Sequence, residues 1–254
     1  MIKLKSVSYK SGNTLSYKEC GNQQGFPILI QHGLIASIND SDLFTHLIDI
    51  GARVILIARP GYGESSPYQM KDIAEWGEII SGFIDELHIS QFDVLGISSG
   101  APYSYSIGNR LVDKVRNIFI LSGTPALFDD NIIRHWPYPI DREMTISKLQ
   151  VLARELFFVN ISESDLLKND IRDSMRNNCF GIALDLKLRC MKWGFSLSDV
   201  KARVHMRHSL KDNQVPIVTA ELTSKMLPNC RMFIKENDEH FSREVLNEFI
   251  RVQI

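Results

Sequence analysis

The stretch Phe92-Asp93-Val94-Leu95-Gly96-Ile97-Ser98-Ser99-Gly100 decides how the whole chain is interpreted. Its beginning is a mostly apolar run typical of a strand, and residues 101–106 after it begin a helix. A G-x-S-x-G turn between a strand and a helix holds its serine in a strained backbone conformation with the hydroxyl exposed. The flanking glycines allow strand and helix to approach closely. Small residues also fill ordinary turns, so the pattern alone leaves Ser98 as either a nucleophile or a plain turn residue.

Short strand-like runs and helical patterns alternate on both sides of this turn. This alternation predicts a doubly wound, mostly parallel sheet with helices on both faces. The predicted strands are 27–31, 53–57, 92–95, 115–121, 202–206 and 231–235, after a hairpin within residues 1–20. The predicted helices are 39–50, 72–87 with Asp72 as its cap, one beginning near 101, 216–226 and 242–250.

The alternation stops between residues 124 and 195. Helical patterns at 146–158, 164–176 and 182–193 follow one another there without a strong strand between them. We therefore expect an inserted helical cap over residues 124–195, on an α/β core made of residues 1–123 and 196–254.

Composition and charge exclude several classes of partner. The 254 residues include 29 basic and 30 acidic side chains, a formal net charge of −1, without a long block of one sign. Nucleic acid and anionic membranes are therefore poor partners. The chain has neither the apolar core of a signal peptide at its start nor a run of about 18 apolar residues, which predicts a cytoplasmic protein without a membrane span.

Motifs for cofactors are also absent from the sequence. The four cysteines form no C-x-x-C pair, which argues against a metal site and a disulfide framework. Neither G-x-x-x-x-G-K nor G-x-G-x-x-G before a helix occurs, so a nucleotide or magnesium cofactor is not expected. We predict that the protein needs no cofactor and no metal.

A serine nucleophile needs a base, and the chain order Ser, Asp, His is the one to look for. His240 follows the predicted strand 231–235, at the carboxyl end of the sheet, where functional groups gather in open α/β folds. His205 lies inside a predicted strand, which favours a structural role, and His208 stands at the entrance of a turn. We therefore choose His240 as the base.

The acid that orients this base is expected at Asp212, in the loop after the predicted strand 202–206. A solvated turn residue is the plain alternative, because most loop aspartates are of that kind. Asp238 is a rival, although a residue so close to His240 in sequence would have to fold back sharply. Asp129 and Asp130 offer a second rival position.

The developing oxyanion needs N–H donors. Candidates are the backbone N–H of Ser99, at the start of the helix, and that of Leu34, in the loop after strand 27–31. His32 in that loop precedes the serine, and we expect it to hold the loop by hydrogen bonds rather than to act as a base.

Several further motifs stand in the order typical of one family. They are His32-Gly33, Arg59-Pro60-Gly61-Tyr62-Gly63-Glu64-Ser65, the serine turn, Asp212 followed by Val215-Pro216, and His240-Phe241. With them the chain resembles the α/β-hydrolase superfamily over nearly its whole core. The resemblance implies an eight-stranded sheet, a Ser98, Asp212, His240 triad, and an oxyanion hole formed by the amides of Leu34 and Ser99. Fold and triad do not fix the substrate.

We predict a carboxylesterase-like serine hydrolase with a cap, which cleaves an ester-type bond of a small-molecule substrate, small to medium in size and partly apolar, through an acyl-enzyme on Ser98. Trp136, Tyr138 and Trp193 either line an apolar pocket for a small or medium acyl group or simply pack the cap. An acyltransferase, a carbon–carbon bond hydrolase and a ligand receptor with little turnover stay open. Relatives that attack with an aspartate are excluded, because Ser98 occupies that position.

Overall fold

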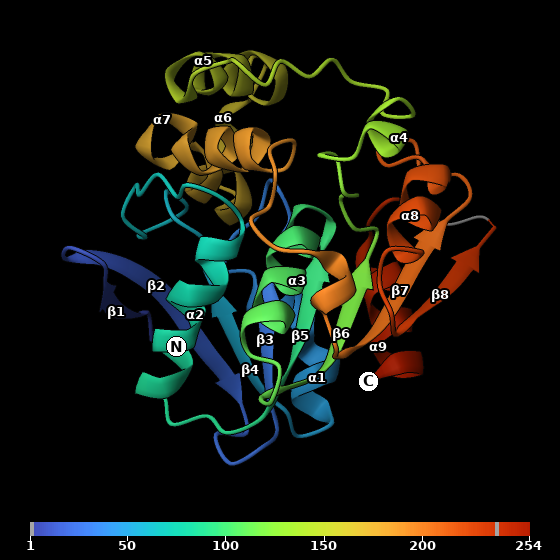
Figure 1. The fold of residues 1–254 in the computed structure, drawn as a ribbon. Coiled ribbons are helices and arrows are strands. Elements are labelled where there is room, and N and C mark those ends of the chain that lie inside the picture. The colour runs from blue at the N-terminus through green and yellow to red at the C-terminus, as the bar shows by residue number, and fades with distance from the viewer. Residues whose placement is uncertain (1–2, 237–238) are drawn as a thin grey trace.

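An eight-stranded sheet forms the centre of the computed structural model, which describes residues 3–236 and 239–254 (Figure 1). The strand order is β1-β2-β4-β3-β5-β6-β7-β8. β1 and β2 pair antiparallel to their neighbours, whereas all the other pairs are parallel. The predicted fold class, a doubly wound and mostly parallel sheet, is therefore confirmed. The strands are β1 (Lys5–Tyr9), β2 (Asn13–Gly21), β3 (Pro27–Gln31), β4 (Arg53–Ile57), β5 (Phe92–Ile97), β6 (Val115–Leu121), β7 (Arg203–Ser209) and β8 (Cys230–Lys235).

Alternate residues of the central strands are buried on opposite faces of the sheet. In β4, Ile55 and Ile57 join one apolar cluster, while Val54 and Leu56 join the other. Both faces of a parallel sheet are covered, so its strands read as continuous apolar runs rather than alternating ones. This is why the sequence predicts these strands so directly.

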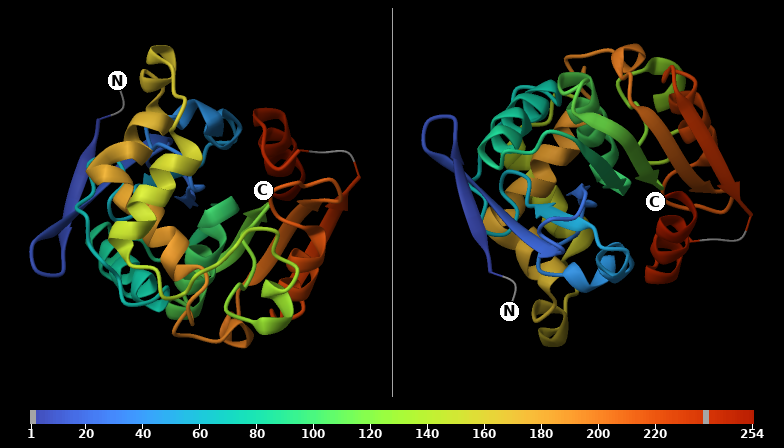
Figure 2. Two further views of the ribbon diagram at one scale, coloured as in Figure 1. Left: turned by 90° about the horizontal axis from the view of Figure 1, so that it is seen from above. Right: turned by 90° about the horizontal axis from the view of Figure 1, so that it is seen from below.

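Two pairs of helices cover the two faces (Figures 1 and 2). α2 (Ala74–Glu86) and α3 (Ala101–Arg110) pack into the first cluster, and α1 (Thr45–Asp49) and α9 (Arg243–Gln253) pack into the second. α8 (Ile217–Ser224) adds Ala220 to the first cluster. The remaining short helices of the core are η1 (Ser41–Phe44), η2 (Ser98–Gly100) and η3 (Leu197–Asp199).

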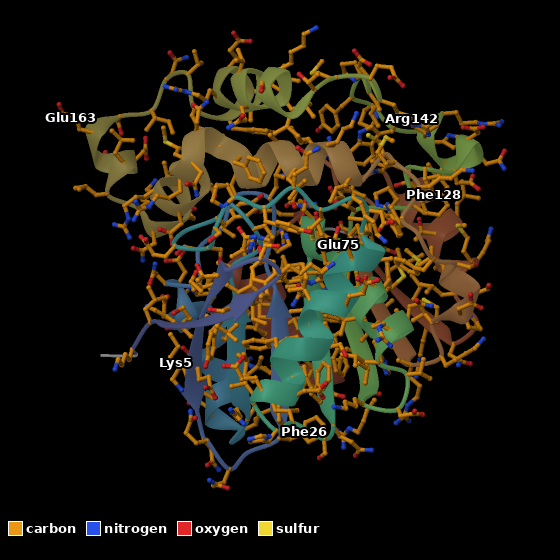
Figure 3. All side chains as sticks on the ribbon, turned by 60° about the vertical axis from the view of Figure 1, so that its left-hand side comes forward. Lys5, Phe26, Glu75, Phe128, Arg142 and Glu163 are labelled. Carbon is orange, nitrogen blue, oxygen red and sulfur yellow. The ribbon has the colours of Figure 1, made fainter. Side chains whose placement is uncertain are left out.

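A helical layer lies above the carboxyl ends of the parallel strands, between β6 and β7 in sequence (Figure 1). Figure 3 shows this layer with Glu163 and Arg142 in it and Lys5 and Phe26 far below, at the sheet. Leu149 and Ala153 of α5 and Ile182, Ala183 and Leu186 of α7 are buried in the second cluster. Because the layer shares a cluster with the sheet, it is packed onto the core. Its helices are α4 (Asp130–Ile133), α5 (Ile146–Phe157), α6 (Glu163–Leu166) and α7 (Asn169–Leu188).

Several element bounds differ from the predictions. The expected helices 164–176 and 182–193 are replaced by α6 and by one long α7, which is interrupted at residues 176–179. Asn177, Asn178 and Cys179 have positive φ there, a conformation that asparagine tolerates better than most residues. β7 extends to Ser209 because Arg207, which looks like the end of a strand in sequence, is buried.

Ile73 rather than the predicted Asp72 is the cap residue of α2, and the Asp72 carboxylate, one residue earlier, accepts the Glu75 N–H at 3.0 Å. The expected helix 39–50 is the pair η1 and α1. Within the described part of the chain, no helix combines the length and the apolar character needed to cross a bilayer.

Candidate active site

Ser98 occupies a sharp turn between β5 and α3, and its φ is +49°. A β-carbon at Gly100 would overlap the carbonyl oxygen of Gln31, and one at Gly96 would overlap the hydroxyl of Ser104. Both flanking positions therefore require glycine, as the pattern predicts. Tight packing therefore holds the backbone of Ser98 in a strained left-handed conformation. Strain of this kind clusters at active sites.

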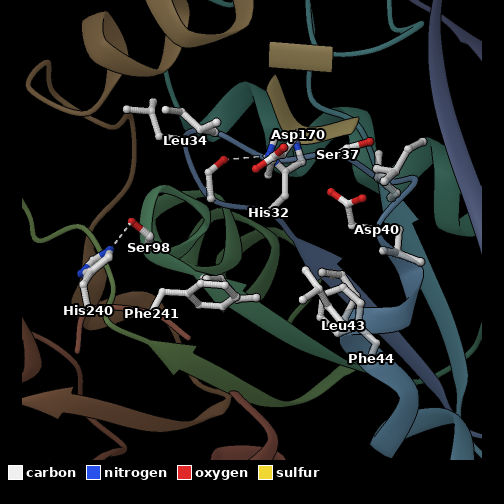
Figure 4. A pocket seen from close by; sticks show the side chains of 18 of the residues that line it. His32, Leu34, Ser37, Asp40, Leu43, Phe44, Ser98, Asp170, His240 and Phe241 are labelled. Atoms are coloured by element: carbon white, nitrogen blue, oxygen red, sulfur yellow. Dashed lines mark hydrogen bonds between the residues drawn. The ribbon is translucent and has the colours of Figure 1, made fainter. Parts of the chain in front are cut away.

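His240 is hydrogen-bonded to both Ser98 and Asp212, and Figure 4 shows its bond to Ser98. His240 Nε2 is 2.9 Å from Ser98 Oγ, and His240 Nδ1 is 2.7 Å from Asp212 Oδ2. An ionised carboxylate only accepts hydrogen bonds, so Nδ1 carries the ring proton and Nε2 is left to accept the serine proton. The structure thus brings together the three residues chosen from the sequence.

The loop after β7 fixes the Asp212 carboxylate. Its Oδ1 accepts the N–H groups of Gln214 at 2.9 Å and Val215 at 2.8 Å. Burial raises the pKa of Asp212, but hydrogen bonds from His240 and these backbone groups outweigh burial and hold the pKa below its ordinary value. Asp212 is therefore a charged, oriented acceptor rather than a solvated turn residue.

The rival histidines contact other groups. His205 stacks on Phe119 with the ring planes 25° apart, and burial lowers its pKa. His208 Nε2 donates to the carbonyl of Val215 at 2.8 Å and lies 3.4 Å from Asp212 Oδ2. His208 therefore supports the acid loop, and it approaches the same carboxylate oxygen of Asp212 to which His240 is bonded.

Among the rival acids, Asp129 accepts the Asn131 N–H and caps α4. The Asp130 side chain is 88% exposed. Asp238 lies outside the described residues.

The loop after β3 lies against the serine turn, because a β-carbon at Gly33 would be 3.8 Å from that of Ser98. His32 stands beside it, and burial together with the Arg59 charge holds the pKa of His32 well below its ordinary value. The neutral ring donates from Nδ1 to the Gly33 carbonyl at 2.8 Å and accepts the Arg59 N–H on Nε2 at 3.2 Å. Both ring nitrogens are used by the backbone, so His32 holds the loop, as expected.

Asp185 of α7 is a buried residue of this region that the sequence reasoning missed. It pairs with Arg59 at 2.6 Å, and both side chains are at most 3% exposed. One signal for it stands in the sequence: Asp185 interrupts the apolar run 182–186, and a carboxylate buried in such a run needs a partner.

A cavity of about 430 Å³ opens beside Ser98 and His240 (Figure 4). Its wall is mostly apolar. The largest share comes from residues 33–44, and the helical layer contributes Phe157 and Asp170. Burial and the nearby Asp170 carboxylate raise the pKa of Asp40, against a hydrogen bond from Asn169. The cavity therefore combines an apolar wall with two carboxylates.

The three aromatic residues predicted for a pocket do not line this cavity. Trp193 is 1% exposed and packs against Tyr105 and Phe128. Trp136 meets Tyr138 edge to face, and Tyr138 is 46% exposed. These three residues pack within the helical layer and against the core, which was the alternative to a role in the pocket.

Across residues 3–236 and 239–254, no three His, Cys, Asp or Glu side chains are grouped so as to hold a metal ion.

Comparisons with known proteins identify the family of the chain. A sequence model for the alpha/beta hydrolase fold matches residues 27–158. The uncharacterized hydrolase YcgS of Bacillus subtilis is 28% identical over 138 residues, 54% of this chain and 45% of that protein. The dihydrolipoyllysine-residue acetyltransferase component of an acetoin cleaving system from Pseudomonas putida is 28% identical over 113 residues, 44% of this chain and 30% of that protein. The chain therefore matches less than half the length of each of these curated relatives.

Solved structures share the fold over nearly the full chain. An esterase from Exiguobacterium antarcticum superposes with a TM-score of 0.74 at 18% identity, over 98% of both chains. Together with the match of the family model to residues 27–158, this identifies the architecture. The chain belongs to the α/β-hydrolase fold family.

Proposed function

We propose that this protein is a serine hydrolase that cleaves a carboxylic ester, or a related acyl bond, of a small to medium and partly apolar substrate. The observation that carries the proposal is the hydrogen-bonded path from Asp212 through His240 to Ser98, which ends on a strained serine at a cavity. The esterase among the structural neighbours supports an ester as the substrate.

In the first step, Ser98 Oγ attacks the ester carbonyl while His240 Nε2 takes its proton. The carbonyl oxygen becomes an oxyanion, to which the N–H groups of Leu34 and Ser99 donate. The tetrahedral intermediate then collapses, the bond to the leaving oxygen breaks, and His240 returns the proton to the departing alcohol. An acyl group is left on Ser98.

In the second step, water enters and His240 takes one of its protons. The hydroxide attacks the acyl carbon, the bond to Ser98 Oγ breaks, and the proton returns to the serine. Asp212 holds the ring in the tautomer that both steps require and stabilises its charged form. The products are a carboxylic acid and an alcohol.

The helical layer, residues 124–195, is proposed as the cap domain over this site. It supplies Phe157 and Asp170 to the cavity wall, and the core supplies the rest. A cavity of about 430 Å³ suits a small or medium ligand, because ligand sites commonly range from about 300 to 1,000 Å³.

A fluorophosphonate probe tests the nucleophile. The full chain is expected to be labelled at Ser98, with labelling lost in Ser98→Ala and strongly slowed in His240→Ala. Failure of the unmodified protein to react, or labelling that does not depend on His240, would contradict the proposal. Turnover of a panel of aryl esters, from acetyl to decanoyl, then defines the acyl chain that the site prefers.

Acyl transfer is the second candidate, and it is favoured by the similarity to an acetyltransferase component. It uses the same acyl-Ser98 intermediate with an alcohol, thiol or amine in place of water. Adding such acceptors to the ester panel distinguishes the two. A transferase forms the acylated acceptor at the expense of the free acid, whereas a hydrolase forms the free acid throughout.

A further inference from the structure

Three consecutive carbonyl groups of the loop beside Ser98 are bound by two side chains. Arg59 Nη1 donates to the carbonyl of His32 at 2.6 Å, and Arg59 Nη2 donates to that of Gly33 at 3.0 Å. The hydroxyl of Tyr62 lies 2.9 Å from the carbonyl oxygen of Leu34. The loop that carries the proposed oxyanion donor is therefore held from its far side.

The Gly33 carbonyl determines where the Leu34 N–H points, because both belong to one peptide group. The peptide group is planar, and the described residues contain no cis bond, so this C=O and N–H point in opposite directions. Arg59 and His32 both donate to the Gly33 oxygen. Fixing that oxygen fixes the direction of the Leu34 N–H.

Tyr62 fixes the peptide group on the other side of Leu34. Its hydroxyl has one proton, which is shared between the Leu34 carbonyl at 2.9 Å and Asp185 Oδ2 at 3.0 Å. With the peptide groups before and after it both held, Leu34 has little freedom to turn its N–H away from Ser98.

Asp185 connects these side chains to the helical layer. Its Oδ2 accepts from Arg59 Nη2 at 2.6 Å and from Tyr62, while its Oδ1 accepts from Arg59 Nε at 3.3 Å. Tyr103 of α3 also donates to Oδ1, at 2.6 Å, but within the described part of the chain its hydroxyl is not bonded to any of the three loop carbonyls. Asp185 thus positions both the Arg59 guanidinium and the Tyr62 phenol.

We propose that Asp185 is a positioning residue for oxyanion stabilisation, acting through Arg59 and Tyr62 on the peptide groups that flank Leu34. The proposal rests on the proposed serine hydrolase function. α7 is accordingly part of the active-site scaffold, and it holds the same loop further along, where Ser174 Oγ accepts the Ala36 N–H at 3.0 Å. Asp173 adds hydrogen bonds from Ser37 and Asn39.

Removing Asp185 directly is a poor test, because it would leave the Arg59 charge buried and unpaired. Two phenols offer a matched pair instead. Tyr62→Phe and Tyr103→Phe each remove one buried hydroxyl that donates to Asp185, but only Tyr62 also holds a loop carbonyl. A purely structural role predicts similar effects of the two variants, whereas a positioning role predicts different ones.

The readouts are single-turnover acylation by an aryl ester and the affinity for a boronic acid that forms a tetrahedral adduct on Ser98. Losing one oxyanion donor costs roughly 10²- to 10³-fold, so a misplaced donor in Tyr62→Phe is expected to slow acylation about 10- to 100-fold. Boronate affinity falls by a similar factor while KM changes little, because the oxyanion exists only in the tetrahedral state. Tyr103→Phe stays within about threefold of the unmodified protein in both readouts.

Equal effects of the two variants, or an effect of Tyr62→Phe on KM alone, would overturn the positioning role and leave the hydrolase proposal standing. An unmodified protein that is never acylated would overturn both. If Tyr62→Phe does not fold, the ¹⁵N–¹H spectrum of the unmodified protein with the boronic acid decides the matter. The Leu34 amide proton is expected to shift downfield on adduct formation, and an unchanged Leu34 signal would refute the proposal.

Discussion

Replacing Asp212 by asparagine reverses the direction of one hydrogen bond in the proposed triad. Oδ1 accepts the N–H groups of Gln214 and Val215, so the oxygen of the asparagine amide must stay on that side. Its NH₂ group then faces Nδ1 of His240, now 2.7 Å from Oδ2. Two donors cannot face each other, so the ring proton moves to Nε2. No lone pair is left there to accept the Ser98 proton.

We expect Asp212→Asn to lower kcat about 10⁴-fold, equivalent to about 5.5 kcal/mol in the activation barrier, with the folded structure retained. Steady-state hydrolysis of an aryl acetate measures the loss, and thermal unfolding checks the fold. Asp129→Asn is the matched control, because Asp129 caps α4 and should leave kcat unchanged. A loss of less than tenfold in Asp212→Asn, or an equal loss in the control, would refute the tautomer argument.

Three further predictions concern stability and specificity. Gly100→Ala is expected to unfold the protein or lower its Tm sharply, because the added β-carbon meets β3 backbone, whereas Gly82→Ala has open space and should stabilise it by about 0.4–1 kcal/mol. Because the pKa of Asp212 is lowered on folding, its ionised form stabilises the protein above the unfolded pKa of about 4. In urea unfolding, the advantage over Asp212→Asn should therefore be complete above that pH and be lost as the pH falls from there through the lower pKa of the folded state. Phe157→Ala, which enlarges the cavity, should raise kcat/KM for long acyl esters relative to acetyl esters, whereas Tyr138→Ala should leave that ratio unchanged.

The sheet was predictable because its strands are buried on both faces. Apolar runs such as 27–31 and 53–57 are long enough to identify a strand and too short for a helix. The serine turn was predictable for a related reason, since Gly96 and Gly100 are required by contacts within a few residues and with the neighbouring strand. Local patterns of this kind are visible in a single sequence.

Element bounds that depend on distant contacts were not predictable. The polar residues at the end of β7 look like the start of a loop, yet Arg207 and His208 are buried by neighbouring elements. The turn at 176–179 inside α7 is fixed partly by Gln150, which donates to the carbonyls of Asn177 and Asn178. Neither the elements that bury the end of β7 nor Gln150, which bonds the turn in α7, can be identified from the local sequence.

Some residues of the candidate site could likewise be predicted from the sequence, and others could not. Ser98, Asp212 and His240 stand in loops at strand ends, where the order of the motifs indicates a shared site. The cavity wall is different, because Trp193 is buried elsewhere and the open space is lined by aliphatic residues of 33–44 together with Phe44, Phe157 and Phe241. Which side chains line a cavity depends on how distant elements pack, and a single sequence does not carry that information.

Trapping the acyl-enzyme tests directly whether Ser98 is the nucleophile. The full chain is mixed with an aryl acetate, quenched in acid within the first turnover, and mapped by peptide mass spectrometry. One acetyl group per chain is expected, on Ser98, and none in Ser98→Ala. Turnover of the ester without an acetyl group on Ser98, or with the group on another residue, would contradict it.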